Sequence, residues 1–290
     1  MSFFNSSRLR IAAIDFLNPA PLMWDFEHDP EQSRIAERYR IHRTMPSECA
    51  AELANGTADI GLIPIASYAT IPGLAVIPGC TIASIDRVRS ILLVVRQSSG
   101  VQAVRTVAAD TSSLTSLAYT QILFHRVWQA TPKFVPHPPN LDQMLSICDA
   151  ALLIGDPALT ALEDAMAREA RTGERLEYID LAHEWRQHTG TPWVSAFWGV
   201  RREALPSDNS AIASVVDDFL HSRDHGLRHI DDIAAEWTTR IALPQEAIRR
   251  YLTENIHYVL DQDCRDGMAL FFEYAVECGA LPAAPALKWL

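Results

Sequence analysis

The chain has 290 residues, a formal net charge of −11 and 48% hydrophobic residues, which suffices for one large core or two smaller ones. Charged residues make up 21% and no low-complexity tract occurs, so disorder is not expected. The acidic balance argues against a nucleic-acid or membrane-surface partner, although a helix N-terminus can bind a small anion whatever the global charge.

The cysteines and the N-terminal residues indicate in which cellular compartment the protein is expected. The five cysteines are widely spaced and include no Cys-x-x-Cys pair, which favours reduced thiols over a disulfide scaffold or a zinc site. The first ten residues lack the basic and apolar regions of a signal peptide, and no uncharged apolar run approaches the ~20 residues of a membrane span. We therefore expect a cytoplasmic protein.

The first third of the chain has a β-α-β pattern. Residues 11–14 form an apolar run that predicts a buried strand, ended by the following Asn-Pro-Ala-Pro stretch. A second strand is expected over residues 38–44 and a third over 58–64. Between them, residues 46–56 predict a helix that begins with proline and ends at Asn-Gly. This order predicts a parallel sheet with right-handed crossovers.

A second series follows. Apolar strands are expected over residues 73–82 and 87–96, after which Ser98-Ser-Gly100 interrupts the pattern. The next elements again alternate. We expect strands over 106–110, 133–135 and 149–154, and helices over 111–130, 141–148 and 158–171.

The last third contains two more expected strands, over residues 176–181 and 192–200, and is helical by spacing from residue 209 onward. The whole order favours two α/β lobes. Residues 1–95 and 198–290 would form a discontinuous first lobe, residues 96–197 the second, and the C-terminal helices would pack on the first. This is the layout of a two-lobed protein that closes on a ligand by a hinge motion.

Three features at expected strand ends are candidates for a ligand site. Asn18 follows the first strand, where open α/β sheets bind ligands, although Asn-Pro also closes turns. Hydroxyl residues crowd the start of the helix expected from residue 111, where they cap free N–H groups or help to bind an anion. Gly155-Asp156 ends a buried strand as a turn or as a ligand-facing loop. The residues alone leave these alternatives open.

Sequence motifs for cofactor or metal chemistry are missing. The chain has no dinucleotide-binding glycine motif, no phosphate-binding loop, no nucleophile elbow and no metal-spaced cluster. His125 and His137 are expected to be solvated or to cap helices, since no partner is paired with them in the sequence. We therefore expect no metal and no cofactor.

Several segments in a fixed order resemble the chorismate dehydratase family, which serves the futalosine route to menaquinone. They include Phe16-Leu-Asn-Pro-Ala-Pro-Leu22, Pro46-Ser47, Ala58-Asp-Ile-Gly-Leu-Ile-Pro64, Val88-Arg-Ser90, Ser113-Leu-Thr-Ser116 and Asp149-Ala-Ala-Leu-Leu-Ile-Gly-Asp156. The resemblance extends over most of the chain, including residues 192–201, 256–260 and 267–271. It implies a two-lobed, type II periplasmic-binding-protein fold without export.

The resemblance also implies roles for single residues. Asn18 and Ser90 are expected to be catalytic. The residues expected to bind substrate are Ser84, Ser113, Thr115, Ser116, Gly155 and Asp156. The chain departs from the family pattern at Ile85-Asp86-Arg87, where Asp-Gly-Pro is more frequent, and at Leu114, where an arginine is usual. Both departures fall in loops expected to face the substrate, which leaves the exact substrate open.

The implied reaction is loss of water from chorismate, giving 3-[(1-carboxyvinyl)oxy]benzoate. The partner would be this small dianion, with no nucleic acid and no membrane; no oligomeric state is predicted. Because aromatisation drives the reaction, donors that position the substrate would suffice without a strong protein base.

Two alternatives remain. One is an enzyme like 1,4-dihydroxy-6-naphthoate synthase of the same pathway, for which His137 would be the candidate proton carrier. The other is a non-catalytic cytosolic binding protein for a small carboxylate.

Overall fold

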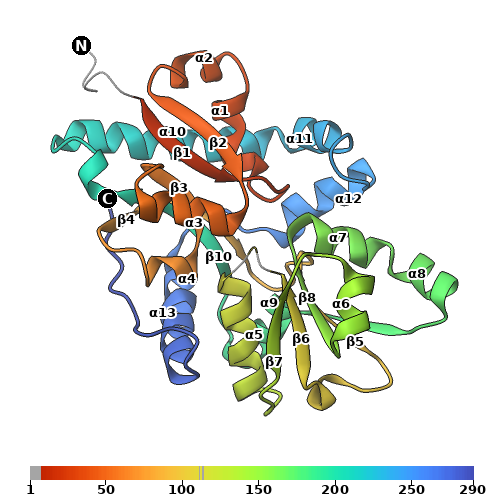
Figure 1. The fold of residues 1–290 in the computed structure, drawn as a ribbon. Helices are drawn as coiled ribbons and strands as arrows, with labels where there is room; N and C mark the ends of the chain where they lie inside the picture. Colours follow the sequence, from red (N-terminus) through yellow and green to blue (C-terminus); the bar gives the residue numbers. More distant parts are fainter. Residues whose placement is uncertain (1–7, 111, 113) are drawn as a thin grey trace.

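Two lobes, each built on a five-stranded sheet, make up the fold of the computed structural model, which describes residues 8–110, 112 and 114–290 (Figure 1). The first sheet has the strand order β2-β1-β3-β10-β4 and the second the order β7-β6-β8-β5-β9. The strands of the first sheet are β1 (Leu9–Ile14), β2 (Tyr39–Thr44), β3 (Ile60–Pro64), β4 (Leu74–Ser84) and β10 (Trp193–Arg201). Those of the second are β5 (Ile91–Arg96), β6 (Thr106–Asp110), β7 (Lys133–His137), β8 (Ala150–Ile154) and β9 (Leu176–Asp180).

The two sheets follow one plan. In the first, β1 pairs in parallel with β2 and β3, while β10 runs antiparallel between β3 and β4. In the second, β6 pairs in parallel with β7 and β8, while β5 runs antiparallel between β8 and β9. The parallel pairing predicted from the β-α-β order is confirmed in both lobes. The antiparallel strands are those that enter from the other lobe.

Helices connect the parallel strands and carry the chain beyond them. In the first lobe these are the short α1 (Trp24–Glu27) and α2 (Glu31–Ile35), α3 (Pro46–Asn55) and α4 (Ile65–Tyr68). In the second lobe they are α5 (Leu114–Arg126), α6 (Leu141–Ile147), α7 (Gly155–Glu163) and α8 (Ala165–Thr172), followed by α9 (Leu181–Thr189). The C-terminal helices are α10 (Asn209–Arg228), α11 (Ile230–Trp237), α12 (Gln245–Arg250) and α13 (Gln262–Glu277).

The chain passes between the sheets twice. It leaves β4 at residue 84 and enters β5 at residue 91, and it returns between residues 180 and 193 by way of α9. Strand β5 thus belongs to the second sheet and β10 to the first, so both passages lie earlier in the chain than the lobe boundaries expected at 95/96 and 197/198. An apolar run signals a strand but does not say which sheet receives it. Helix α9 was not expected; Asp180 caps it by accepting hydrogen bonds from the N–H groups of Ala182 and His183.

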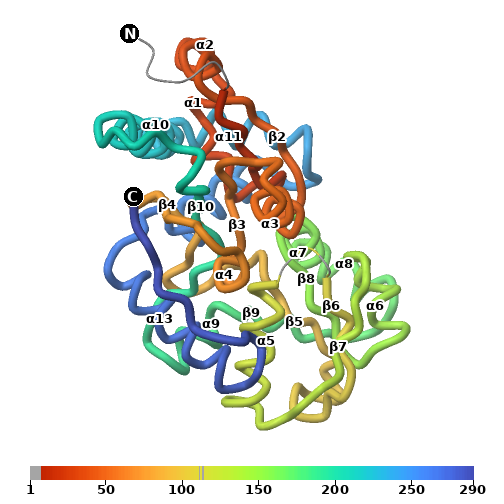
Figure 2. Tube along the Cα trace, turned by 60° about the vertical axis from the view of Figure 1, so that its left-hand side comes forward, coloured from red at the N-terminus to blue at the C-terminus, as the bar shows by residue number. Residues whose placement is uncertain are grey.

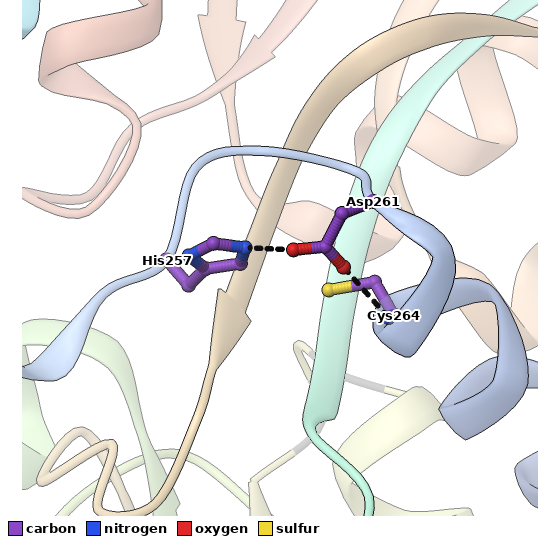
Figure 3. A group of neighbouring side chains, drawn as sticks. All are labelled: His257, Asp261 and Cys264. Carbon is purple, nitrogen blue, oxygen red and sulfur yellow. Dashed lines mark hydrogen bonds and ion pairs between the residues drawn. The ribbon is translucent and has the colours of Figure 1, made fainter.

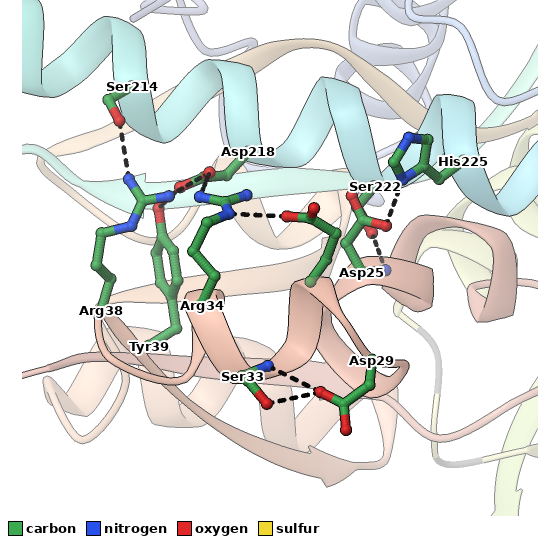
Figure 4. A network of polar contacts seen from close by, with 11 residues as sticks. Asp25, Asp29, Ser33, Arg34, Arg38, Tyr39, Ser214, Asp218, Ser222 and His225 are labelled. Atoms are coloured by element: carbon green, nitrogen blue, oxygen red, sulfur yellow. Dashed lines mark hydrogen bonds and ion pairs between the residues drawn. The ribbon is translucent and has the colours of Figure 1, made fainter.

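Helix α10 packs on the first lobe, as predicted for the C-terminal helices (Figure 4). The buried carboxylate of Asp218 accepts hydrogen bonds from Arg38 and, at 2.8 Å, from the Tyr39 hydroxyl, both next to or on β2. Closer to the helix C-terminus, Asp25 of α1 pairs with His225 at 2.7 Å. These contacts join segments about 180 to 200 residues apart into one unit.

Helix α13 contacts both lobes. It packs against β10 of the first sheet and α5 of the second lobe, beside which it lies in Figure 2. The rings of Tyr119 on α5 and Phe271 on α13 are 4.3 Å apart, and Tyr119 also stacks on Trp193 at 3.7 Å. The expected packing on the first lobe therefore holds for α10, whereas α13 packs against both lobes where they meet. No helix in the described ranges has the length and apolar character needed to cross a membrane.

Three main-chain N–H groups of the first lobe donate hydrogen bonds to the second. Each lies just past the carboxyl end of a parallel strand. The bonds are Leu17 N to Asp156 Oδ1 (3.0 Å), Ser47 N to Ser112 O (3.1 Å) and Ala66 N to Thr115 Oγ1 (3.0 Å). Ser47 and Ala66 lie in the first turns of α3 and α4, where an N–H group has no acceptor within its own helix. The second lobe thus caps helices of the first, and the lobes are closed.

Gly155 offers a test of the contact between lobes. Its φ is +61°, and a Cβ there would come within 2.7 Å of the Phe16 ring. Gly155→Ala should therefore cost roughly 1–3 kcal/mol from overpacking on top of the backbone strain. Gly173→Ala is the matched control, because its φ is +71° with no atom within 4 Å. Thermal unfolding should show a larger fall in Tm for Gly155→Ala; equal falls would contradict a tight contact with Phe16.

Asp156 should make the stability depend on pH. Burial raises its pKa from 3.8 to about 6, only partly opposed by the Leu17 N–H and the charge of Arg240. A raised carboxyl pKa stabilises the fold below about 3.8, and this contribution is lost as the pH rises through about 6. Asp156→Asn keeps an acceptor for Leu17 and removes the titration.

The Tm of Asp156→Asn relative to the parent protein should therefore rise from about pH 4 to about pH 7. Asp164→Asn, at the exposed end of α7, controls for the lost charge. A constant difference across this range for Asp156→Asn would contradict the raised pKa.

Candidate functional site

A cavity lies between the lobes at the ends of the parallel strands. The empty space there is about 420 Å³ when the open mouth is included. The first lobe contributes residues past β1, at the end of β3, at the start of α3 and on β10. The second contributes residues past β8 and in the first turn of α5. Of the residues predicted from the sequence, Asn18, Ser90, Ser116 and Gly155 line it.

Asn18 lies past β1, as its position before Pro19 predicted. Its main-chain oxygen accepts a hydrogen bond from the Tyr258 hydroxyl at 3.0 Å. Its side-chain Oδ1 is buried with no hydrogen-bond partner in the described part of the protein. A buried carbonyl oxygen without a partner is costly, typically ~1–3 kcal/mol, unless a ligand or water donates to it. The Asn18 amide is therefore available to a ligand in the cavity.

Ser90 lies in the first passage between the sheets, directly before β5. Its side chain is 1% exposed. Its main-chain oxygen accepts from Gly155 N at 2.7 Å, and its Oγ accepts from the Tyr251 hydroxyl at 2.8 Å. The residue thus joins the strand-end loop of the second lobe to the C-terminal segment of the chain. Both bonds fix Ser90 against the cavity wall.

The hydroxyl residues at the start of α5 have two different surroundings: one lines the cavity and another contacts the first lobe. Ser116 lines the cavity, whereas Thr115 is buried and binds Ala66 N of the first lobe. Ser113, also predicted to bind substrate, lies outside the described residues. Asp110, at the end of β6, accepts from both the N–H and the hydroxyl of Ser112. Burial raises the Asp110 pKa, against the effect of these two bonds.

The other predicted substrate-binding residues are not among those that line the cavity in this closed form. Asp156 faces Leu17 N, next to the cavity-lining Gly155. Ser84 lies at the end of β4 opposite Trp193, with its buried Oγ unpartnered among the described residues. The two departures from the family pattern, Ile85 and Leu114, are 45% and 51% exposed and do not line the cavity either.

Sequence reasoning missed several contributors. Ser195 on β10 lines the cavity, and its Oγ accepts from Trp193 Nε1 at 2.8 Å. Phe16 closes the wall against Gly155. Tyr251 and Tyr258 hold Ser90 and Asn18 from a segment about 160 and 240 residues away. Alternation along β10 could have indicated Ser195, but no local signal links the two tyrosines to the site.

The cavity wall carries little charge. Among the described residues that line it there is no Asp, Glu, His, Lys or Arg. Its polar side chains are Asn18, Ser90, Ser116 and Ser195. His137 lies on the edge strand β7, with Nδ1 2.6 Å from Pro138 O, and His125 is exposed on α5. Neutral donors therefore have to hold any anionic ligand bound here.

One cluster of metal-ligand residue types lies elsewhere (Figure 3). His257, Asp261 and Cys264 present one ligand atom each, all within 4.8 Å of one another. Asp261 is the N-cap of α13, accepting from Cys264 N at 2.9 Å, and its other oxygen is 2.8 Å from His257 Nε2. Burial raises the Cys264 pKa to about 12, so the thiol keeps its proton. The cluster is accounted for as a helix cap, and the absence of a metal stays a prediction.

Solved structures share this architecture. A protein from Archaeoglobus fulgidus, AF1704, superposes with a TM-score of 0.72 at 13% identity, covering 96% of this chain and all of its own (100%). The periplasmic aliphatic sulphonate binding protein SsuA from Escherichia coli superposes with a TM-score of 0.64 at 16% identity, covering 99% of this chain and 94% of its own. At such identities the likeness concerns the fold alone. It confirms the expected periplasmic-binding-protein-like fold.

Sequence comparison reaches further. A curated protein of Thermus thermophilus named chorismate dehydratase is 29% identical over 260 residues, which cover 86% of this chain and 90% of that protein. A family model described as menaquinone biosynthesis matches residues 9–277. Because this match spans both lobes and almost all of the chain, the protein belongs to the menaquinone biosynthesis family.

Proposed function

We propose that the protein is a chorismate dehydratase, a hydro-lyase that converts chorismate into 3-[(1-carboxyvinyl)oxy]benzoate and water. The observation that carries the proposal is that Asn18 and Ser90, distant in sequence, line one cavity between the lobes. The similarity to the Thermus thermophilus protein of that name supports the same reaction. The substrate is then a small dianion, and the protein works on it without a cofactor.

The chemistry needs a proton acceptor and a leaving hydroxide. The ring C–H bond next to the C–OH bond breaks, its electron pair forms the new ring double bond, and the hydroxyl leaves and takes up a proton as water. No carboxylate or imidazole side chain lines the described cavity wall, so a carboxylate of the substrate itself takes the ring proton. The ring becomes aromatic, which supplies much of the driving force.

The protein contributes position and hydrogen bonds. Ser90 and Asn18 orient the reacting carboxylate and the leaving hydroxyl, and the start of α5, with Ser116, binds a carboxylate through neutral donors and the positive end of the helix dipole. The closed lobes keep bulk water from the ring. Catalysis by such positioning does not require a side chain with a shifted pKa.

The rival reaction, a 1,4-dihydroxy-6-naphthoate synthase-like one, would need a proton carrier at the cavity. His137, the sequence's candidate, lies on the outer edge of the second sheet and bonds to Pro138 O. This position favours the dehydratase. A protein that only binds a small carboxylate is separated from both enzymes by product formation.

Turnover of chorismate tests the proposed reaction directly. Purified protein mixed with chorismate, without added metal or cofactor, should form a product lighter by one water with an aromatic ultraviolet spectrum, followed by mass spectrometry. Binding that raises the Tm without any product would replace the dehydratase with a binding protein. Chorismate that neither reacts nor binds would point to a different ligand.

Substitution of Asn18 and Ser90 tests their assigned roles. Asn18→Ala and Ser90→Ala should each lower kcat by roughly 10²–10³-fold, the usual cost of one oriented donor in a water-excluded site. Thermal unfolding should show that both variants fold. Ser67→Ala is the matched control for Ser90, because Ser67 is equally buried but does not line the cavity. Near-normal turnover in both site variants would overturn the assignment.

A further inference from the structure

The C-terminal segment after α12 reaches both residues assigned to catalysis. Tyr251 begins a π-helical turn, Tyr251–Asn255, and its hydroxyl donates to Ser90 Oγ at 2.8 Å. Tyr258, just beyond that turn, donates to Asn18 O at 3.0 Å. Each tyrosine is 3% exposed, and neither is among the residues that line the cavity. A ligand therefore meets Ser90 and Asn18, with the tyrosines behind them.

This segment is held firmly in place. Asn255 Nδ2 donates to Arg87 O at 2.9 Å, in the passage that leads to Ser90. His257 forms a β-bridge with Ala83 of β4, with main-chain hydrogen bonds of 2.9 and 2.8 Å. His257 is tied in turn to Asp261, the cap of α13 (Figure 3). A hydroxyl carried by such a braced segment has a defined direction.

The Tyr251 hydroxyl donates to Ser90 Oγ at 2.8 Å. Burial raises the pKa of Tyr251 well above its usual range, so the hydroxyl keeps its proton at neutral pH. A serine hydroxyl has one proton and two lone pairs. With one lone pair of Ser90 Oγ occupied by the Tyr251 proton, the serine's own proton points away from Tyr251. Since Ser90 lines the cavity, that proton is free to be donated to a ligand there.

We propose that Tyr251 is a positioning residue that acts through Ser90, orienting the serine hydroxyl as a donor toward the leaving hydroxyl of the substrate. The inference rests on the proposed function, for which it supplies the reason that a neutral serine can assist departure of hydroxide. Without the phenol, the Ser90 hydroxyl would rotate freely and donate in the productive direction for only part of the time. A rival explanation is purely structural: Ser90 would serve only to satisfy a buried phenol.

A double-mutant cycle in kcat separates these explanations. Tyr251→Phe keeps the ring and removes the donor, and should lower kcat about tenfold with KM within about twofold, as loss of an orienting bond does. In the Ser90→Ala background, the same change should alter kcat by less than about twofold, because Tyr251 then has no hydroxyl to orient. Equal losses in both backgrounds would overturn the proposal.

Tyr39→Phe is the matched control. Tyr39 is another buried tyrosine that donates at 2.8 Å to a side-chain oxygen, that of Asp218, away from the cavity. Both Phe variants should lose a similar amount of Tm, but only Tyr251→Phe should lose kcat. If both lower Tm and neither lowers kcat, the role of Tyr251 is structural and the proposal fails.

Two further outcomes are distinguishable. If the parent protein does not dehydrate chorismate, the proposed function fails and this inference with it; if it does and the cycle is additive, only the inference fails. If Tyr251→Phe alone does not fold, Ser90→Ala is compared with the double variant, in which no hydroxyl of the pair lacks a partner. Equal residual kcat supports the proposal, and a large further loss contradicts it.

Discussion

Among the described residues, the main-chain N–H groups of Leu17, Ser47 and Ala66, just past β1, β2 and β3, find their acceptors in the second lobe, and the closed site depends on these bonds. A buried N–H left unpaired costs about 1–3 kcal/mol. These bonds therefore stabilise the contact between the lobes and also determine their relative position. Four of the residues that make these bonds are neighbours of cavity residues: Leu17 precedes Asn18, Ser47 follows Pro46, Thr115 precedes Ser116, and Asp156 follows Gly155. At each of these points one residue holds the lobes together while its neighbour in the chain lines the cavity.

Because adjacent residues have these different roles, the site could be predicted from the sequence only in part. Strand-end reasoning and the resemblance placed the candidates in the right loops, because the carboxyl ends of parallel strands meet at one edge. They could not decide which of two adjacent hydroxyls faces the cavity, because that depends on the direction of each side chain once the lobes have closed. Thr115 is the example: its hydroxyl caps α4 of the other lobe, whereas Ser116, one position later, lines the wall. Tyr251 lay beyond prediction, since its bond to Ser90 spans 161 positions and has no local pattern.

The fold was predictable where local pattern determines structure. Apolar runs bounded by proline or Asn-Gly gave strands and helices close to those observed. The sheet that receives β5 was not predictable in this way, since its pattern is satisfied equally by either lobe and topology decides. Helix α9 differs, because a signal was present: Asp180 is a capping residue, and Leu181 and Trp185 recur at helical spacing on a buried face. Attention to caps in addition to strand alternation would have found it.

The lack of charged side chains in the described cavity wall affects both the base and the leaving group of the proposed reaction. A carboxylate paired with an arginine has its pKa lowered by about 1–3 units and is a correspondingly weaker base. The described part of the wall places no cation beside the substrate, so only hydrogen bonds lower the pKa of its carboxylates there. The harder task is then departure of hydroxide, because the described part of the wall offers no acidic side chain to protonate it. A hydroxyl donor held in one direction is what such a wall can provide, and Ser90, fixed by Tyr251, is the residue placed to provide it.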